Sequence, residues 1–369
     1  MHHRAKFAIG LAGWMLLGLG AACSRTGLLD DYESSDWPAS CSRKALRLRV
    51  VEQPPNLYFV LDRSGSMAES MPGVQSTKYA AVRQAVVALV KNLGSHVNVG
   101  AAVFPASGRL CQPGEEVFPT TRGDDLAGSD VEGPVTAAFS EAINVVTLGY
   151  TPTAATLENL LPTLSKLPGK KAVILATDGG PNCNPDARCD ASECISNIQQ
   201  VSGCSTSANC CSPSAGPDAP RMCLDREPTL EAVRALREAD IATYVIGIPG
   251  SQAFTDLLSD LAEAGGTARK EEPRYYAVGD VDALVAALEQ IGGELVTCDM
   301  RLDEVPLDTS QVKVFLDGEE VGRDHTDGFT WTGDRSFRLL GPSCAAFREG
   351  RIKRIDAFAH CDDGQPPRP

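Results

Sequence analysis

The sequence predicts an α/β protein in which helices flank a doubly wound, mainly parallel β-sheet. Over residues 51–295, apolar runs of strand length alternate with segments of helical periodicity, the order that parallel sheets with crossover helices produce. The run 172–176 is apolar at every position, which is typical of a strand buried on both faces. Beyond residue 295 the pattern changes to short alternating segments, so we expect a separate, small β module over 296–369.

The first half of the alternating region predicts three strands and three helices. The strands, of which the last is a short return strand, lie at 57–61, 97–104 and 117–118. Apolar residues at helical spacing predict helices over 79–93, 135–146 and 154–167. Ser76 or Thr77 is suited to cap the first helix. Pro162 is expected to interrupt the third helix, because proline has no amide hydrogen to donate.

The second half of the region continues the same alternation. Further strands are predicted at 172–176, 241–248 and 275–278. Further helices are predicted over 230–239, 254–264 and 281–291. Pro228 is placed to open the first of these helices, and Gly265 with Gly266 to end the second.

Residues 181–226 interrupt this order with an insert rich in Ser, Asp, Asn, Pro and Gly. A loop of this length would lack order without cross-links, and each disulfide would stabilise it by about 2–4 kcal/mol. The insert holds an odd number of cysteines, so at least one must pair outside it. Cys111 is the first candidate, because its loop shares the carboxyl edge of the sheet with the insert. The cysteines of the insert are Cys183, Cys189, Cys194, Cys204, Cys210, Cys211 and Cys223.

The sequence predicts a set of short strands for the C-terminal module over 296–369. They are predicted at 311–316, 330–332, 336–340 and 352–359. Asp317-Gly318 is a hairpin-turn signal after the first of them. Cys298, Cys344 and Cys361 belong to the module, and Cys41 is a candidate fourth partner. Cys41 lies toward the end of segment 23–50, whose acidic, weakly periodic sequence predicts a linker or tether.

The first residues, 1–22, have the order of an export signal. Arg4 and Lys6 precede an apolar core over 7–19, and this core is short for a membrane span. The chain contains 13 cysteines, and an even number remains when Cys23 is set aside. Such cysteine usage beside an export signal indicates a disulfide framework formed in an oxidising compartment.

The residues before Cys23 resemble the cleavage box of bacterial lipoproteins, in which the cysteine carries the lipid. Gly20 departs from that box, which usually has a large apolar residue at this position. Cleavage by an ordinary signal peptidase near Ala22 is the alternative. We therefore expect either a lipoprotein of the bacterial cell envelope or a secreted protein, touching the membrane only through a lipid anchor.

The net charge of −14 disfavours nucleic acid as a partner. Nucleic-acid binding needs Lys and Arg to neutralise phosphates, and removal of the export signal would take Arg4 and Lys6 away as well. The acidic balance suits a soluble surface or an attraction for cations.

An acid and two hydroxyls follow the first strand of the sheet. They are Asp62, Ser64 and Ser66, spaced two apart, with Gly65 allowing a sharp turn between the serines. In open α/β sheets, ligands bind at the carboxyl ends of the strands. Hard cations such as Mg²⁺ prefer oxygen ligands, so the motif predicts part of a metal site. In the alternative reading, these serines are turn residues that cap a helix.

Two further motifs extend a resemblance to von Willebrand factor A-type (VWA) domains with a metal-ion-dependent adhesion site. Asp62, Ser64 and Ser66 match the Asp-x-Ser-x-Ser element of that family. Gly149-Tyr150-Thr151-Pro152-Thr153 matches its threonine loop, with Thr151 in the ligand position and Thr153 as the alternative. Thr177-Asp178-Gly179 matches its aspartate turn. The resemblance covers about residues 55–295, with the cysteine-rich insert as an addition.

This resemblance implies a module that binds a partner protein through a metal. Ser64, Ser66 and Thr151 would coordinate Mg²⁺ directly, with Mn²⁺ or Ca²⁺ as alternatives, while Asp62 and Asp178 act mostly through bound waters. The ion would then accept an Asp or Glu carboxylate of the partner. Loops 105–133 and 181–226 would select that partner.

Other functions would require different sequence features. A hydrolase needs a nucleophile with a base in reach, but Ser64 and Ser66 lack the Gly-x-Ser-x-Gly elbow. His96 falls at the opposite edge of the predicted sheet. We therefore expect no enzyme activity. A structural envelope protein, in which the metal only braces the loops, remains the main alternative.

Overall fold

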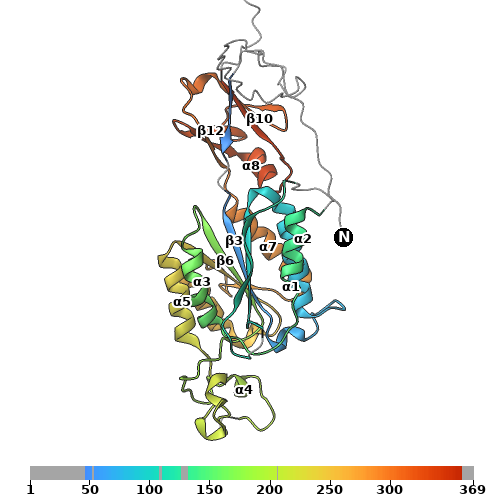
Figure 1. Ribbon diagram of the computed structural model, residues 1–369, viewed down its shortest axis with the longest axis vertical. Coiled ribbons are helices and arrows are strands. Elements are labelled where there is room, and N and C mark those ends of the chain that lie inside the picture. Colours follow the sequence, from blue (N-terminus) through green and yellow to red (C-terminus); the bar gives the residue numbers. More distant parts are fainter. Residues whose placement is uncertain (1–45, 52–53, 108–109, 126–131, 206, 360–369) are drawn as a thin grey trace, which may run out of the picture. The chain divides into compact units, whose positions relative to one another are not determined.

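In the computed structural model, which describes residues 46–51, 54–107, 110–125, 132–205 and 207–359, six strands form the main sheet (Figure 1). Their order across the sheet is β5-β4-β3-β6-β7-β8. All neighbours run parallel except β4 and β5, which are antiparallel. The strands are β3 (Asn56–Asp62), β4 (Asn98–Phe104), β5 (Glu115–Arg122), β6 (Lys171–Thr177), β7 (Ile241–Gly247) and β8 (Tyr276–Ala277). The predicted doubly wound, mainly parallel sheet is confirmed.

Helices cover both faces of this sheet (Figure 1). One face carries α1 (Lys78–Leu93), α2 (Pro134–Ala142) and α7 (Val281–Leu295), and the other carries α3 (Thr153–Leu164), α5 (Arg226–Glu238) and α6 (Thr255–Ala264). The central strand β3 is buried throughout. Its odd positions, such as Phe59, pack with the first set of helices, and its even positions, such as Val60, with the second. This two-sided burial explains the continuous apolar runs in the sequence.

Three helices differ from the expectation at their C-terminal ends, and one of them, α7, runs to Leu295 rather than ending at residue 291. Helix α2 ends at Ala142 rather than at residue 146, because the next residues run back to the end of β3. There the backbone N–H of Leu148 donates to the carbonyl of Arg63 at 2.8 Å. Helix α3 contains Pro162 without interruption and ends two residues later, so the missing amide falls in its last turn.

The C-terminal module consists of two antiparallel four-stranded sheets, β1-β14-β10-β11 and β12-β13-β9-β2. The strands are β1 (Leu46–Leu48), β2 (Val50–Val51), β9 (Asp299–Leu302), β10 (Val312–Leu316), β11 (Glu319–Val321), β12 (Gly328–Gly333), β13 (Ser336–Leu340) and β14 (Ile355–Ala359). The predicted hairpin turn is present, with positive φ at Asp317 and Gly318. Helix α8 (Gly341–Arg348) and strands β1, β2 and β9 were not expected. Residues at the end of the expected tether thus form strands of the module.

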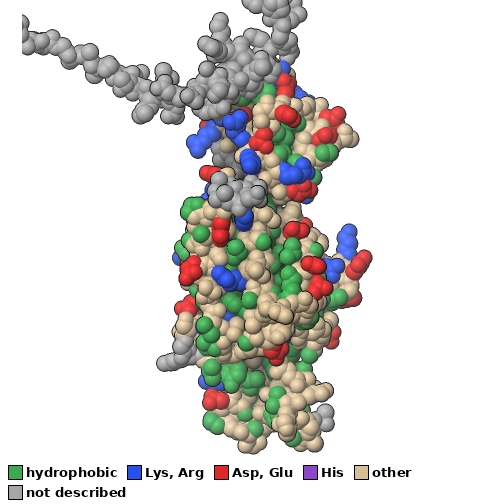
Figure 2. Space-filling model, turned by 90° about the vertical axis from the view of Figure 1, so that its right-hand side faces the viewer, with side chains coloured by type: hydrophobic (Ala, Val, Ile, Leu, Met, Phe, Trp, Pro, Cys, Tyr) green, Lys and Arg blue, Asp and Glu red, His purple; other side chains and the backbone are tan. Residues whose placement is uncertain are grey.

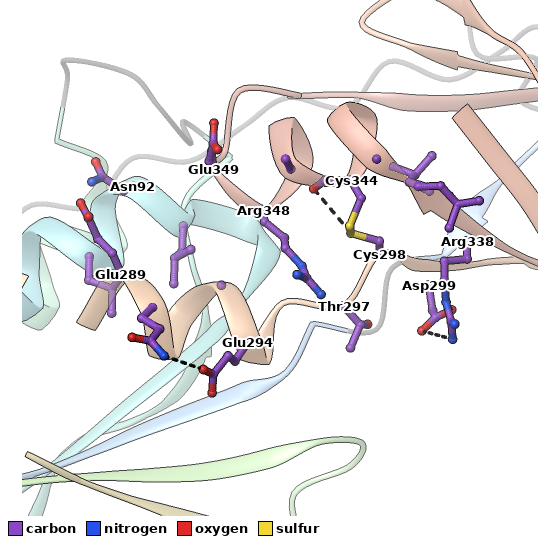
Figure 3. Close-up of a pocket in the computed structure, with 18 residues that line it drawn as sticks. Asn92, Glu289, Glu294, Thr297, Cys298, Asp299, Arg338, Cys344, Arg348 and Glu349 are labelled. Atoms are coloured by element: carbon purple, nitrogen blue, oxygen red, sulfur yellow. Dashed lines mark hydrogen bonds and ion pairs between the residues drawn. A yellow bond between two sulfur atoms is a disulfide. The ribbon is translucent and has the colours of Figure 1, made fainter. Parts of the chain in front are cut away.

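The module contacts the amino end of the main sheet through α8. The rings of His96 and Phe347 lie 4.3 Å apart in an edge contact, and Nε2 of His96 is 3.2 Å from the carbonyl of Ile352. Nε of Arg348 donates to the carbonyl of Val296 at 3.0 Å. A groove of about 1010 Å³ lies beside these contacts, and Figure 3 shows the Cys298–Cys344 disulfide in its wall.

Charged side chains of both signs are interspersed over the face shown in Figure 2. No helix in the described part of the chain combines the length and the apolar character that a membrane span requires. The predicted export signal, Cys23, Cys41 and Cys361 lie outside the described residues.

Candidate metal centre

The carboxyl ends of β3 and β6 meet at the topological switch point of the main sheet. The chain leaves β3 toward β4 on one side and leaves β6 toward β7 on the other. Asp62 is the last residue of β3, and Asp178 follows the last residue of β6. A crevice for a ligand forms where strand order reverses in this way. The two acids predicted from the sequence are therefore placed where the fold offers a binding site.

Asp62 is fully buried and bound on both of its oxygens. Oδ1 accepts a hydrogen bond of 2.8 Å from the backbone N–H of Ser64, and Oδ2 accepts one of 2.6 Å from Oγ1 of Thr177. The first bond closes the turn that follows β3, and the second fixes the carboxylate against the end of β6. The side chain is thus held in one orientation by both strands.

The two serines connect Asp62 with Asp178. The hydroxyls of Ser64 and Ser66 lie 3.2 Å apart, and that of Ser66 donates to Oδ1 of Asp178 at 2.8 Å. Ser64 and Asp178 are buried, whereas Ser66 is half-buried. Four of the five predicted ligands therefore form one cluster that is reached from solvent beside Ser66.

Thr151 lies beside the turn that contains Asp178 and Gly179. A Cβ atom placed on Gly179 would come within 4.0 Å of its Oγ1, so this hydroxyl faces the aspartate turn. Its backbone N–H donates to Oδ1 of Asn182 at 2.9 Å, and Asn182 returns a bond from its own N–H to the carbonyl of Thr151. The neighbouring Thr153 begins α3, and its hydroxyl lies 3.5 Å from the carbonyl of Thr151.

The threonine loop is held against the serine turn by close backbone contacts. Gly149 has a φ of +84° and accepts a hydrogen bond of 3.0 Å from the N–H of Gly65. A Cβ on Gly149 would lie 2.7 Å from the ring of Pro105 and 2.9 Å from the carbonyl of Leu110. Only glycine fits this position, which explains the glycine that opens the motif.

Arg63 braces this arrangement, although its role was not foreseen in the sequence. Its guanidinium is buried and donates from Nε to the carbonyl of Pro105 at 2.7 Å and from Nη1 to that of Val146 at 2.6 Å. These carbonyls belong to the two loops on either side of the serine turn. An arginine between Asp and Ser in a turn gives no sequence signal for this contact, because exposed arginines are common there.

Lys78 is a second residue that the sequence did not reveal. It begins α1 directly after the capping residue Thr77, whose Oγ1 accepts from the N–H of Ala80 at 3.2 Å. Nζ of Lys78 lies 2.9 Å from Oδ2 of Asp178 and 2.7 Å from Oε2 of Glu69. The ammonium thus belongs to the candidate centre, although its backbone lies outside the motifs.

The burial of two carboxylates at one site shifts both toward their protonated forms. Burial, together with the negative charge of Asp178, raises the pKa of Asp62 to about 7. Burial also raises the pKa of Asp178, although Lys78 and Ser66 act against it. A divalent cation would relieve this cost by supplying positive charge. Two carboxylates and three hydroxyls form the all-oxygen donor set that a hard cation prefers.

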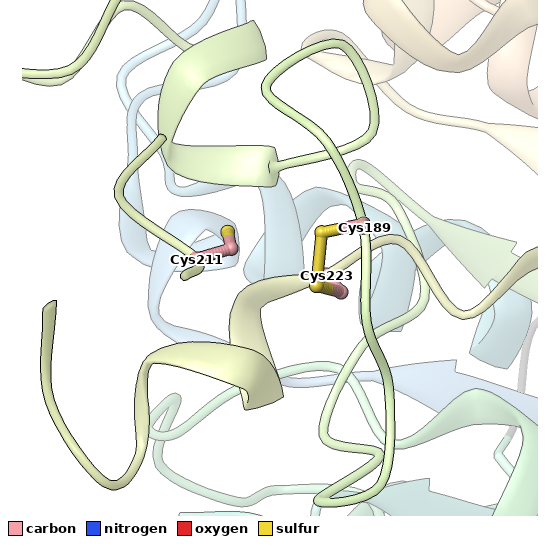
Figure 4. Close-up of side chains that lie close together, drawn as sticks. All are labelled: Cys189, Cys211 and Cys223. Carbon is pink, nitrogen blue, oxygen red and sulfur yellow. A yellow bond between two sulfur atoms is a disulfide. The ribbon is translucent and has the colours of Figure 1, made fainter. Parts of the chain in front are cut away.

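The insert is attached next to the threonine loop. Cys111 and Cys183 form a disulfide, so the expected bridge between the insert and the loop after β4 is present. Within the insert, which includes the short helix α4 (Ile195–Ile198), three further disulfides join Cys189 to Cys223, Cys194 to Cys211, and Cys204 to Cys210. Sulfur atoms of Cys189, Cys211 and Cys223 lie within 4.8 Å of one another (Figure 4). Because all three are in disulfides, they cannot serve as thiolate ligands of zinc.

An open pocket of about 920 Å³ lies beside the threonine loop. Leu110, Tyr150 and Arg221 are among its lining residues. Leu110 and Tyr150 are exposed, and the N–H of Tyr150 donates to the carbonyl of Leu110 at 2.9 Å. The pocket thus combines an apolar wall from the main domain with a charged wall from the insert.

The histidines in the described part of the chain do not supply a base at this site. His96 precedes β4 at the opposite edge of the sheet, and His325 is exposed in the C-terminal module. His360 lies outside the described residues.

No protein-family model matches this sequence, and no curated protein matches it either. Among solved structures, the pilus adhesin SpaC from Lactobacillus rhamnosus GG has a TM-score of 0.48 at 15% identity, covering 85% of this chain and 39% of that chain. The chain thus spans well under half the length of SpaC. The vWF domain of the type V pili tip protein Mfa5 from Porphyromonas gingivalis has a TM-score of 0.43 at 14% identity, covering 65% of this chain and 94% of that chain.

A manganese-loaded TRAP protein from Plasmodium vivax has a TM-score of 0.39 at 16% identity, covering 66% of this chain and 76% of that chain. The strand order and the switch point, rather than these likenesses, identify the doubly wound fold of the present chain.

Proposed function

We propose that this chain is a VWA-type module that binds a partner protein through a divalent cation. Ser64, Ser66 and Thr151 are the proposed hydroxyl ligands, while Asp62 and Asp178 act mainly through water. Mg²⁺ is the expected ion, and Mn²⁺ and Ca²⁺ are alternatives with the same preference for oxygen.

One observation carries this proposal: Asp62, Ser64, Ser66 and Asp178 form a hydrogen-bonded cluster at the switch point, although 112 residues separate Ser66 from Asp178. Helix capping does not account for the cluster. The 3₁₀ helix after the first serine receives no side-chain cap from Ser64, and Ser66 bonds to a distant aspartate instead. The buried acids also lack enough positive charge around them, which a divalent ion would provide.

The proposed mechanism follows from the chemistry of the donor set. A bound divalent cation would provide Lewis acidity toward an anionic oxygen. Hydroxyl ligands are neutral, so Ser64, Ser66 and Thr151 leave most of the cation's charge available to a partner's Asp or Glu carboxylate. Asp62 and Asp178 anchor the ion's shell while remaining hydrogen-bonded to the protein. The half-buried Ser66 marks the side from which the partner approaches.

The surroundings of the centre provide a surface for selecting the partner. We propose that the partner rests on the pocket lined by Leu110, Tyr150 and Arg221, next to its metal-bound carboxylate. The Cys111–Cys183 bridge fixes the insert to this pocket, so the insert acts as part of the recognition surface.

We also propose that the protein is exported, either as a lipoprotein anchored through Cys23 or in secreted form. Five disulfides in the described residues support an oxidising compartment. Attachment to the cell envelope would place the binding surface where an adhesion module acts.

The structural alternative, in which a metal only braces the loops, explains less of the geometry. Arg63 already joins the two loops beside the serine turn, and a disulfide joins the insert to one of them. A hydrolase is also less well supported, because the described histidines lie away from Ser64 and Ser66.

Calorimetric titration of the mature chain with MgCl₂ and MnCl₂ tests the centre. Wild type should bind one ion, and Asp62→Ala should lose binding by at least about tenfold while keeping its circular dichroism spectrum. Asp186→Ala, which removes an exposed acid of the insert, is the matched control and should bind like wild type. Equal affinity in Asp62→Ala and wild type would remove the assignment.

Pull-down from envelope and medium then separates adhesion from bracing. The immobilised mature protein should retain a partner in Mg²⁺ and release it in EDTA, and Asp62→Ala should retain none. Retention that is equal with and without chelator would favour the structural role.

A further inference from the structure

Lys78 places a fixed positive charge inside the candidate metal centre. It is only 4% exposed, and its Nζ lies between Oδ2 of Asp178 at 2.9 Å and Oε2 of Glu69 at 2.7 Å. The two acids differ in their surroundings, because the side chain of Asp178 is 1% exposed and that of Glu69 is 67% exposed. Solvent screens the outer pair, so the ammonium acts chiefly on Asp178.

The backbone around Lys78 encloses the ammonium. Gly250 has a φ of +116°, and a Cβ at that position would lie 3.2 Å from Nζ of Lys78 and 3.0 Å from the carbonyl of Asp178. The loop after β7 therefore passes directly over the Lys78–Asp178 pair. A buried ammonium is costly unless it is paired, so this enclosure ties Lys78 to Asp178 rather than to solvent.

Lys78 changes the total charge of the centre from that of the five predicted ligands alone. Asp62 and Asp178 bring two negative charges when ionised, which a divalent cation would cancel. Lys78 adds one positive charge, so the buried part of the loaded centre keeps a net positive charge, which the solvent-screened carboxylate of Glu69 offsets only in part. We propose that Lys78 is a built-in counter-cation that weakens metal binding and strengthens the capture of a carboxylate by the metal-loaded centre.

The weaker metal binding and the stronger capture of a carboxylate both follow from the position of Lys78 beside Asp178. In the metal-free protein, Lys78 partly neutralises Asp178, and an arriving cation must act against the ammonium. Once the ion is bound, an incoming carboxylate is attracted by the ion and by Lys78 together. Two unit charges a few ångströms apart interact strongly where solvent is largely excluded. Removal of the charge should therefore change each affinity by about tenfold or more.

This inference rests on the proposed metal site, and its test is built so that the two can fail separately. Mn²⁺ alone is titrated into mature wild type, Lys78→Met and Lys78→Arg by calorimetry. Lys78→Met keeps the length of the aliphatic stem without the charge and should bind Mn²⁺ about tenfold more tightly than wild type. Lys78→Arg keeps the charge and should stay within about threefold of wild type. Lys166→Gln, which removes an exposed charge beyond the end of α3, should bind like wild type.

Acetate is the probe for the second proposed effect, the capture of a carboxylate by the metal-loaded centre. Its binding to the Mn²⁺-loaded proteins is followed through the relaxation of water protons, and Lys78→Met should bind acetate about tenfold more weakly than wild type. A wild type that binds no Mn²⁺ would refute the metal centre itself. A wild type that binds Mn²⁺ with the same affinity as Lys78→Met would overturn the role of Lys78 and leave the centre intact. Equal shifts in Lys78→Met and Lys78→Arg would show that packing, rather than charge, is responsible, which also overturns it.

Should Lys78→Met fail to fold, Lys78→Gln supplies the second variant. It removes the positive charge but keeps a side-chain N–H donor, so Mn²⁺ should bind more tightly than in wild type. Unchanged or weaker binding in Lys78→Gln would contradict the inference.

Discussion

The hydroxyl of Ser66 donates a hydrogen bond of 2.8 Å to Oδ1 of Asp178, across 112 residues of sequence. Ser66 belongs to the turn after β3, and Asp178 follows β6, the strand next to it in the sheet. This bond ties together the two strand ends at the switch point. It also shows that the hydroxyl of Ser66 bonds to the end of the neighbouring strand rather than capping a helix.

Replacement of Ser66 by Ala should weaken Mn²⁺ binding by about tenfold or more, because one oxygen ligand is lost and Asp178 loses a hydrogen bond. The free energy of unfolding should fall by only about 1 kcal/mol, the usual value of one hydrogen bond. Calorimetry with Mn²⁺ and urea unfolding would measure the two effects. Ser70→Ala, four residues away on an exposed position, should change neither quantity.

The two threonines of the 149–153 loop should differ in their effect on metal binding. The hydroxyl of Thr151 faces the aspartate turn, whereas that of Thr153 lies near the carbonyl of Thr151. Thr151→Val removes one hydroxyl with little change in shape, and it should reduce Mn²⁺ affinity by about tenfold. Thr153→Val serves as the control and should leave the affinity within about threefold. The opposite order of effects would assign the ligand role to Thr153.

The stability of the metal-free protein should depend on pH in the direction set by its buried acids. Burial raises the pKa of Asp62 from 3.8 to about 7, so between these values the folded protein binds more protons than the unfolded chain. The free energy of unfolding in EDTA should therefore fall as pH rises from about 4 to 7, by an amount on the order of 3 kcal/mol.

Urea unfolding at several pH values, with EDTA and with Mg²⁺, would measure this dependence. Asp62→Asn should make the curve in EDTA shallower because one of the two buried acids with a raised pKa is gone. Saturating Mg²⁺ should offset the fall in wild type, since the ion favours the ionised carboxylate. A stability in EDTA that rises over the same pH range would contradict the raised pKa.

The sequence predicted the core of the candidate centre because the motifs follow strands. Asp62 and Asp178 come directly after apolar runs, and the carboxyl ends of parallel strands must meet at one edge. Lys78 and Arg63 could not be predicted in this way. Their burial depends on contacts with Gly250, Pro105 and other distant loops, and residue type alone suggests an exposed side chain.

The fold of the C-terminal module was predicted less completely for a related reason. Strand β1 has three residues, and Leu46 pairs with Ala359 at the other end of the chain. A strand so short has no periodicity of its own, and the pairing over this distance leaves no local signal. The turn at Asp317-Gly318 was predicted because its preference for positive φ is local.

The Cys111–Cys183 bridge should stabilise the protein more than the Cys204–Cys210 bridge. The first spans 72 residues and the second spans 6. The entropy of loop closure then predicts losses of about 4 and about 2 kcal/mol when each pair is replaced by alanine. Chemical unfolding of the two double variants under non-reducing conditions would compare them. Equal losses would show that the native contacts of each bridge, rather than loop length, determine its contribution.

Arg63 should act on the metal centre through the loops rather than by contact with the ion. Arg63→Met would leave the carbonyls of Pro105 and Val146 without their donors, and the buried one, that of Pro105, would cost about 1–3 kcal/mol when unpaired. We expect a lower free energy of unfolding and faster hydrogen exchange over residues 146–151, measured by mass spectrometry. Mn²⁺ affinity should fall only a few-fold, because Thr151 loses its support while the other proposed ligands stay in place.

Arg234→Met on the exposed face of α5 should leave exchange in this loop unchanged. If Arg63→Met abolished Mn²⁺ binding but left loop exchange as in wild type, a direct electrostatic role would replace the bracing role.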